Sequence, residues 1–237
     1  MNIKRISAIV LSGALLTGVG FTSTQSAQAA TDRYINVSAT GSVKVTPDTV
    51  RINATVTFVG TTSAVAQSTA ATTASAIRDA LKSNGIVAQY IKSQNVTIYP
   101  EYNYTTDKGS VLVGYRASQS FEIIVRNAKN AGTVVDAIVA AGGDKMNLDG
   151  VTPYVFDNTK ATDAARADAV TRAKAKAAHY AKLLGVKLSS VTSLDETTAP
   201  SPYPIMMATA KMDSGATQID LGQQDVSVSV NVRWSIK

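Results

Sequence analysis

The chain of 237 residues is 45% apolar and 17% charged, a composition typical of a folded protein and too apolar for general disorder. It contains no cysteine, which excludes disulfide bonds, thiol nucleophiles and lipid attachment through cysteine. The formal net charge of +6 is spread without a block of lysine and arginine, so nucleic acid is not an expected partner. The mild positive charge is compatible with contact with anionic cell-surface polymers.

The first 29 residues have the pattern of a secretory signal peptide. Lys4 and Arg5 form a basic start, residues 6–19 form an apolar run, and Ala-Gln-Ala at residues 27–29 is a small-residue cleavage site. The alternative is an uncleaved membrane anchor, but the run is shorter than the roughly 20 residues needed to span a bilayer. We therefore expect a signal peptide at residues 1–29. The mature domain would then be residues 30–237, without a transmembrane segment and outside the cytoplasm as a secreted, periplasmic or cell-surface protein.

The mature chain opens with strand signals. Residues 35–39 and 43–46 predict two short strand pieces that are separated by a break at Thr40 and Gly41. Residues 49–59 then alternate apolar and polar side chains, which is the pattern of a strand with one buried face.

From residue 49 to residue 156 the expected order is strand, helix, strand, strand, helix, strand, the split βαβ arrangement. Helical spacing and the glycines that follow it predict the two helices. Pro100 indicates that its strand is an edge strand or carries a bulge. The elements after the first strand are expected at residues 61–84 (helix), 92–104 (strand), 111–125 (strand), 130–141 (helix) and 145–156 (strand, interrupted at Asp149 and Gly150).

Residues 158–185 predict the longest helix, which is rich in alanine. Asn158 or Thr159 can cap its start, and Gly185 suits a left-handed residue after its end. Its small side chains would let the helix approach a sheet closely. The predicted buried face contains Ala169, Val170, Ala173, Ala177, Tyr180, Ala181 and Leu184.

The last part of the chain predicts a strand at residues 189–195, a long polar loop at residues 197–218 and a strongly alternating strand at residues 225–236. No linker divides the mature chain. We therefore expect a single α+β domain, with split βαβ units and helices packed on one face of a largely antiparallel sheet.

The long helix and both ends of the domain resemble the SIMPL-domain family, and in particular its periplasmic immunogenic and oxidative-stress-defence members. The resemblance rests on residues 35–41 with Pro47 and Asp48, on residues 219–222, and on the helix and the strand after it. It implies an extracytoplasmic protein linked to oxidative-stress tolerance and surface antigenicity, with ring-like homo-oligomers, and it supplies no catalytic residue. In and after the helix the matching residues are Ala165, Ala169, Ala173, Lys176, Ala177, Tyr180, Ala181, Leu184, Gly185, Val191 and Glu196.

Catalytic chemistry lacks its usual residues. His179 is the only histidine and is expected on the polar side of the long helix, so neither a nucleophile–histidine pair nor a zinc site is predicted. Two acidic pairs remain, Asp195 with Glu196 and Asp144 with Asp149, but strand ends and turns use acidic residues routinely. We expect no catalytic residue, no bound metal and no cofactor.

Two groups of residues are candidates for a binding site or an interface. Tyrosines on the central hairpin could form an aromatic strip that binds sugars or partner chains, or they could pack across the strands. An apolar tip in the long loop could contact another subunit or a membrane, or could fold over the core. The candidate residues are Tyr99, Tyr102, Tyr104 and Tyr115 in the hairpin and Tyr203, Ile205, Met206 and Met207 in the loop.

Two hypotheses about function follow. The first is a non-enzymatic, extracytoplasmic protein that forms a homo-oligomer and supports envelope integrity or oxidative-stress tolerance. The alternative is a protein that binds a sugar or cell-wall ligand, or a hydrolase, using the tyrosine-rich hairpin or the acidic pairs.

Overall fold

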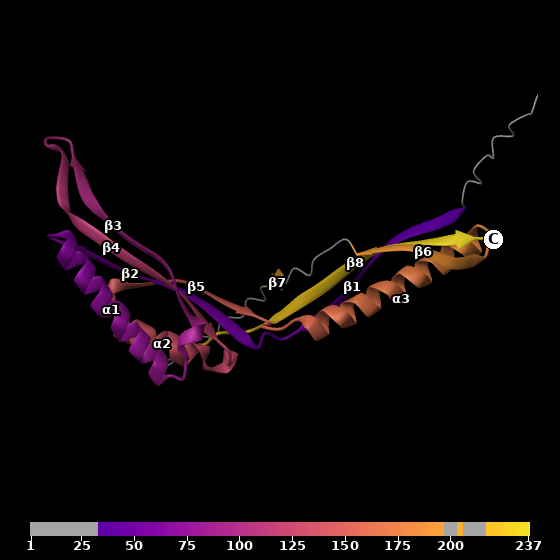
Figure 1. Cartoon of the computed structure of the whole chain (residues 1–237), viewed down its shortest axis with the longest axis horizontal. Coiled ribbons are helices and arrows are strands. Elements are labelled where there is room, and N and C mark those ends of the chain that lie inside the picture. Colours follow the sequence, from indigo (N-terminus) through magenta and orange to yellow (C-terminus); the bar gives the residue numbers. More distant parts are fainter. Residues whose placement is uncertain (1–32, 197–202, 206–216) are drawn as a thin grey trace, which may run out of the picture. The chain divides into compact units, whose positions relative to one another are not determined.

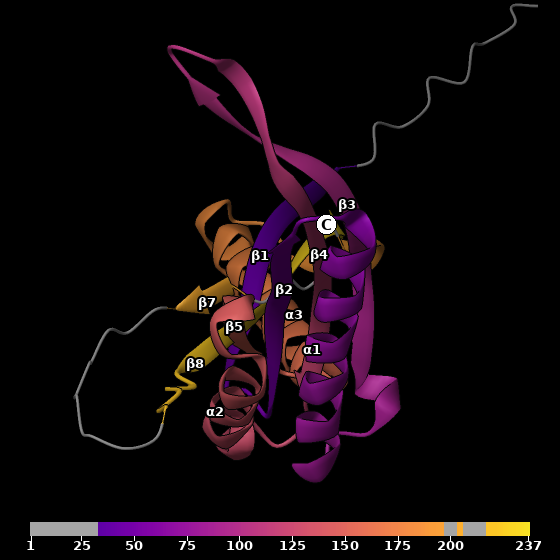
Figure 2. The same ribbon diagram turned by 90° about the vertical axis from the view of Figure 1, so that its left-hand side faces the viewer.

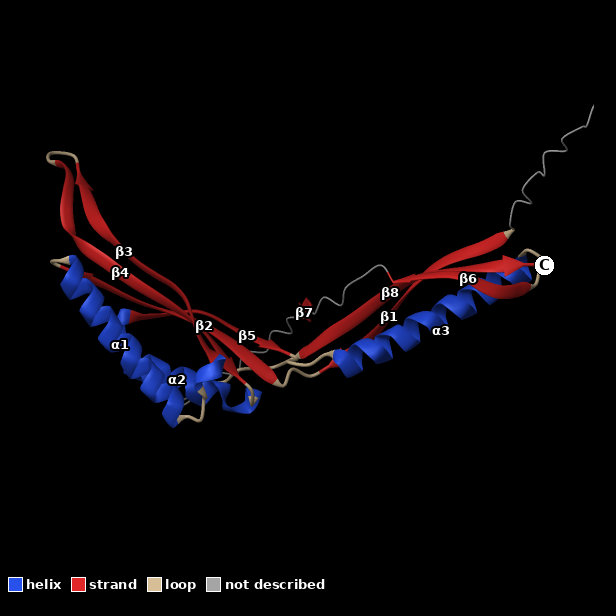
Figure 3. Cartoon of the chain, in the orientation of Figure 1, coloured by secondary structure: helices blue, strands red, loops and turns tan. Residues whose placement is uncertain are grey.

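Two antiparallel sheets with three helices make up the described chain (Figure 3). The computed structural model describes residues 33–196, 203–205 and 217–237, and these residues belong to one compact unit. The predicted α+β class is therefore confirmed, and the antiparallel pairing is present as two sheets where the sequence suggested one.

The first sheet comes from the middle of the chain. Its elements are β2 (Thr49–Gly60), α1 (Ser63–Ser83), β3 (Ile91–Thr105), β4 (Gly109–Val125), α2 (Ala131–Gly142) and β5 (Met146–Tyr154). The strands lie in the order β3-β4-β2-β5, and every neighbouring pair is antiparallel (Figure 1). This arrangement confirms the predicted split βαβ order. Short 3-10 helices join the elements at Ala88–Tyr90, Ala128–Asn130 and Gly143–Lys145.

The helices α1 and α2 cover one face of this sheet. They lie next to each other over the strands (Figure 2), and Ile77, Leu81 and Ile138 from the helices meet Ile52 and Phe121 from the sheet in one core. All five side chains are fully buried. Each large side chain buried in this way stabilises the fold by about 1.5–3 kcal/mol.

The second sheet combines the start and the end of the described chain. Its elements are β1 (Tyr34–Val45), α3 (Thr159–Leu183), β6 (Leu188–Glu196), β7 (Tyr203–Ile205) and β8 (Gln223–Ile236). β8 pairs with β1 over almost its whole length, and its other edge pairs with β6 and β7. A strand thus occurs at residues 203–205, where a loop was expected.

The helix α3 packs on the second sheet through alanine side chains alone for most of its length. Its buried residues include Ala165, Ala169, Ala173, Ala177 and Ala181, one at every fourth position. Residues four apart form a row along a helix, and α3 buries this one row against the sheet. Three residues of the predicted face lie outside this row and are exposed: Val170 is 38% exposed, Tyr180 42% and Leu184 66%.

Gly41 lies where β1 comes closest to α3. A Cβ atom at this position would lie 2.2 Å from the carbonyl oxygen of Ala165 and 2.2 Å from the amide nitrogen of Ala169. β1 runs without interruption through Thr40 and Gly41, so the predicted break there is wrong. Because it has no side chain, Gly41 allows the strand and the helix to approach each other closely, and it does not mark a turn.

The two ends of α3 follow the capping rules. Asp157 accepts hydrogen bonds from the amide of Thr159 at 3.0 Å and from its hydroxyl, and these bonds lower the pKa of Asp157. Asn158 occupies the N-cap position, one of the two predicted, but its side chain makes no capping hydrogen bond. Gly185 has a φ of +66°, as predicted.

The segment before β8 is held against the first sheet. Ile219 and Leu221 pack on its hydrophobic core, and Asp136 of α2 accepts hydrogen bonds from the amide of Thr217, at 3.2 Å, and from its hydroxyl. The side-chain Nε2 of Gln224, at the start of β8, donates a hydrogen bond of 2.7 Å to the backbone carbonyl of Pro153. These contacts connect the end of the chain to both α2 and β5.

The contact between Asp136 and Thr217 makes stability depend on pH. The hydrogen bonds from Thr217 lower the pKa of Asp136 below its ordinary value of 3.8. A carboxyl group with a lowered pKa contributes stability that is present above the unfolded pKa and is lost as the pH falls through the folded pKa. We expect Asp136→Asn to unfold at lower urea concentration at pH 7. The difference from the wild type should begin to narrow as the pH falls below 3.8 and should close only once the pH is below the lowered pKa of the folded state.

The control is Asp107→Asn, which removes one charge from the exposed turn of the β3–β4 hairpin. It should leave the urea midpoint unchanged at both pH values. If Asp136→Asn remained less stable by the same amount at low pH, the carboxylate would not be the source of the effect.

Candidate functional site

The hairpin formed by β3 and β4 exposes apolar side chains on both of its faces. β3 is the edge strand of the first sheet, and the hairpin extends past the start of α1 in both views (Figures 1 and 2). Exposed apolar patches of this kind mark interaction sites in monomeric folds. We call it the hairpin surface, and its exposed residues are Val96, Ile98, Tyr99, Tyr102, Tyr104, Val111, Leu112 and Val113.

The strand order confirms the edge strand that Pro100 predicts, because Pro100 lies in β3 at the edge of the first sheet. The pairing of β3 with β4 also carries two register irregularities. One irregularity falls between Ser93 and Asn95 and the other between Glu101 and Tyr102. Bulges twist an edge away from further pairing. The half of the edge before Pro100 contains only one of them.

The strand register assigns the four hairpin tyrosines to two faces. Tyr102 and Tyr104 are separated by two positions and share a face of β3, whereas Tyr99 lies on the opposite face. Tyr115 pairs with Pro100, which places it on the face of Tyr102 and Tyr104, and it is half-buried against the core. The structure therefore brings three of the predicted tyrosines to one face, of which Tyr104, 82% exposed, is the most accessible.

The opposite face carries an ion pair beside Tyr99. Arg116 is the register partner of Tyr99 and forms a salt bridge with Glu101. The hydrogen bond to Glu101 raises the pKa of Arg116. This face of the hairpin therefore combines an aromatic ring with a neutralised charge pair.

The sequence-based candidates in the long loop are only partly described. Tyr203 and Ile205 belong to β7, whose backbone pairs with residues 223–225 of β8. Met206 and Met207 lie outside the described residues. The aliphatic part of the hairpin surface was missed in the sequence, although three consecutive apolar residues, Val111 to Val113, signal that both faces of a strand are apolar.

One residue of each predicted acidic pair makes a structural contact. Both oxygens of Glu196 accept hydrogen bonds from Arg166, at 2.7 and 3.1 Å, and the pKa of Glu196 is lowered by this hydrogen bonding. Asp149 accepts a hydrogen bond of 2.6 Å from Thr55. His179 is exposed on α3. Within the described ranges, no group of three or more His, Cys, Asp or Glu residues is arranged to hold a metal ion.

Comparison with known proteins gives matches over most of the chain. The family model SIMPL, described as a protein of unknown function (DUF541), matches residues 35–234. The 26 kDa periplasmic immunogenic protein of Brucella melitensis is 32% identical over 216 residues, which cover 86% of this chain and 84% of the relative. The protein of the same name from Brucella abortus has the same identity and coverage.

A third relative is the uncharacterized protein YggE of Escherichia coli, 27% identical over 201 residues that cover 84% of this chain and 80% of the relative. No helix of the described residues has the length and apolar character required to cross a membrane.

Proposed function

We propose a function for this chain, which belongs to the SIMPL family. The protein works outside the cytoplasm, is not an enzyme and associates with copies of itself. The location is supported by the signal-peptide pattern of residues 1–29 and by the Brucella relatives, which are named periplasmic proteins. The role would be to support envelope integrity or oxidative-stress tolerance.

The observation that carries self-association is the exposure of the hairpin surface. Apolar surface left in water costs roughly 25 cal/mol per Å², and an edge strand such as β3 offers unpaired backbone groups to another chain. A second copy that covers the hairpin would remove the apolar side chains from water and pair the free backbone groups of β3. The hairpin surface thus supports an interface in which two copies bury the same apolar side chains.

The state of the acidic groups supports a non-enzymatic role. A general acid needs a raised pKa near the working pH, whereas Glu196 has a lowered pKa because Arg166 binds both of its oxygens. An ion pair of this kind holds α3 to the end of β6. A role in oxidative stress could not use a thiol, because the chain has no cysteine, and its five methionines are the oxidisable sulfur groups.

A second candidate function is ligand binding by the hairpin tyrosines. Tyr102 and Tyr104 share one exposed face, and aromatic rings in such positions can stack on sugars of the cell wall. Titration of the mature protein with cell-wall oligosaccharides, with tryptophan and tyrosine fluorescence as the signal, separates this function from self-association.

The test of self-association is a charge placed in the hairpin surface. Leu112→Lys would bury an ammonium group in the proposed interface, which is unfavourable without a partner. We expect the dissociation constant of the oligomer, measured by sedimentation velocity over a dilution series, to rise at least about tenfold, which corresponds to about 1.4 kcal/mol.

Val139→Lys is the matched control. Val139 is 45% exposed and Leu112 is 47% exposed, but Val139 lies on α2, away from the hairpin. The control should sediment as the wild type does. If Leu112→Lys also associated as the wild type does, the hairpin surface would not be the interface.

A further inference from the structure

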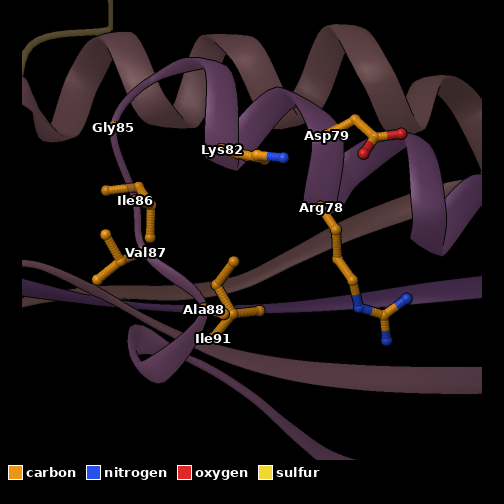
Figure 4. Close-up of a pocket in the computed structure, with 8 residues that line it drawn as sticks. All are labelled: Arg78, Asp79, Lys82, Gly85, Ile86, Val87, Ala88 and Ile91. Carbon is orange, nitrogen blue, oxygen red and sulfur yellow. The ribbon is translucent and has the colours of Figure 1, made fainter.

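A pocket of about 560 Å³ lies between the last turns of α1 and the segment that leads into β3 (Figure 4). Pockets for small ligands have volumes of roughly 300–1,000 Å³ and are lined mainly by apolar side chains with a few polar groups. Gly85, whose φ is +77°, reverses the chain after α1 and so brings the two walls together. The side chains that determine the chemistry of the walls are Arg78, Asp79, Lys82, Ile86, Val87 and Ile91.

The two walls differ in character. Ile86, Val87 and Ile91 form an apolar wall on the segment after α1, and Arg78 and Lys82 project from the helix beside it (Figure 4). Val87 and Ile91 are not fully buried, so part of the apolar wall faces the open pocket.

The cationic groups outnumber the acidic one. Arg78 lies over the ring of Phe121 at 4.9 Å and donates a hydrogen bond of 3.3 Å to Ser93, which fixes its guanidinium group. Among the described residues, no salt bridge involves Arg78 or Lys82. Asp79 is the only acidic residue of the lining, so the pocket carries an excess positive charge that a bound anion would neutralise.

We propose that this pocket binds a small amphiphilic anion, namely a molecule with one carboxylate and an aliphatic chain. The carboxylate would pair with Lys82, with Arg78 as a second cation, and the chain would lie against Val87 and Ile91. A charge-assisted hydrogen bond and the burial of apolar surface act together in such a site. A purely polar anion would leave the apolar wall in water, and a cationic amphiphile would meet the ammonium group of Lys82.

The experiment uses the full mature protein and decanoate as the probe. Isothermal titration calorimetry should show saturable binding with one site per chain, and amide NMR spectra should shift at residues 85–91. We expect Lys82→Gln to weaken binding about fivefold, since one partly exposed ion pair is lost. Decyltrimethylammonium, which has the same chain and the opposite charge, should bind at least about fivefold more weakly than decanoate.

Lys182→Gln provides the matched control. Lys182 lies in the last turn of α3 before a left-handed glycine, as Lys82 does in α1, so the two variants lose the same interaction with the helix end. Val87→Ser tests the apolar wall at an exposed position and should also weaken binding. Circular dichroism of each variant, at the temperature of the calorimetry, checks that the fold is retained.

The proposal is overturned if decanoate does not saturate one site, or if the NMR shifts are confined to the hairpin surface. It is also overturned if Lys82→Gln binds as the wild type does, or if Lys182→Gln weakens binding to the same degree. The pocket does not use the hairpin surface. A protein that binds decanoate as a monomer would therefore support this site while contradicting self-association.

Discussion

Gly41→Ala is expected to destabilise the protein by about 3 kcal/mol, at the upper end of the cost of overpacking. The added methyl group would lie 2.2 Å from backbone atoms of Ala165 and of Ala169. Backbone atoms inside a helix cannot move aside as a flexible side chain can, so β1 and α3 would have to separate. Separation would expose the alanine row to water, which adds to the cost. Urea unfolding of the mature protein at one fixed concentration measures the effect.

Gly150→Ala is the control for the loss of glycine flexibility. Gly150 lies in β5, and a Cβ atom there would have no heavy atom within 4 Å. This substitution should change the urea midpoint little. A Gly41→Ala protein as stable as the Gly150→Ala protein would mean that β1 and α3 do not approach each other so closely.

Ala177→Leu is expected to destabilise the protein by roughly 1–3 kcal/mol, because it overpacks the contact between α3 and the second sheet. Ala177 is fully buried in the alanine row. Leucine is nearly as good a helix former as alanine, so the cost would come from packing and not from helix propensity. The same urea measurement reports it.

Ala175→Leu places the same side chain on the exposed side of α3 and should cost little. Equal losses of stability in the two variants would show that the buried face of α3 is assigned wrongly. All stability comparisons should be made at one protein concentration, since binding between copies shifts the apparent stability.

Most helices and strands could be predicted from the sequence, because each element needs one apolar face regardless of which element it packs against. The strand expected at residues 49–59 is β2, and the helix expected at residues 61–84 is α1, with ends displaced by two residues or fewer. The division into two sheets was not predicted. Alternation identifies the buried face of a strand but not its neighbour, and β1 finds its partner in β8 at the other end of the chain.

The role of Gly41 was misinterpreted for a similar physical reason. A glycine between two strand patterns is compatible with a turn and with a close contact, and only the position of α3 distinguishes these. The buried face of α3 was predicted too broadly, because helical periodicity alone does not say how many rows of the helix its partner covers. The exposed residues Val170 and Leu184 show the difference.

The candidate site could be predicted only in part. Four tyrosines in one hairpin were visible in the sequence, but a spacing of three residues already separates Tyr99 from Tyr102 on a strand. The half-burial of Tyr115 depends on its packing against the core of the first sheet. The pocket beside Lys82 could not be foreseen, since its walls come from a helix and from the segment after it, and periodicity does not report how far apart these lie.

The central claim is that the mature protein associates with copies of itself, and the mass of residues 30–237 in solution tests it most directly. Sedimentation velocity at micromolar concentrations should give a mass that is a multiple of the monomer mass and that decreases on dilution. Leu112→Lys should shift that decrease to higher concentration. A wild-type protein that sediments as a monomer at every concentration would contradict the claim.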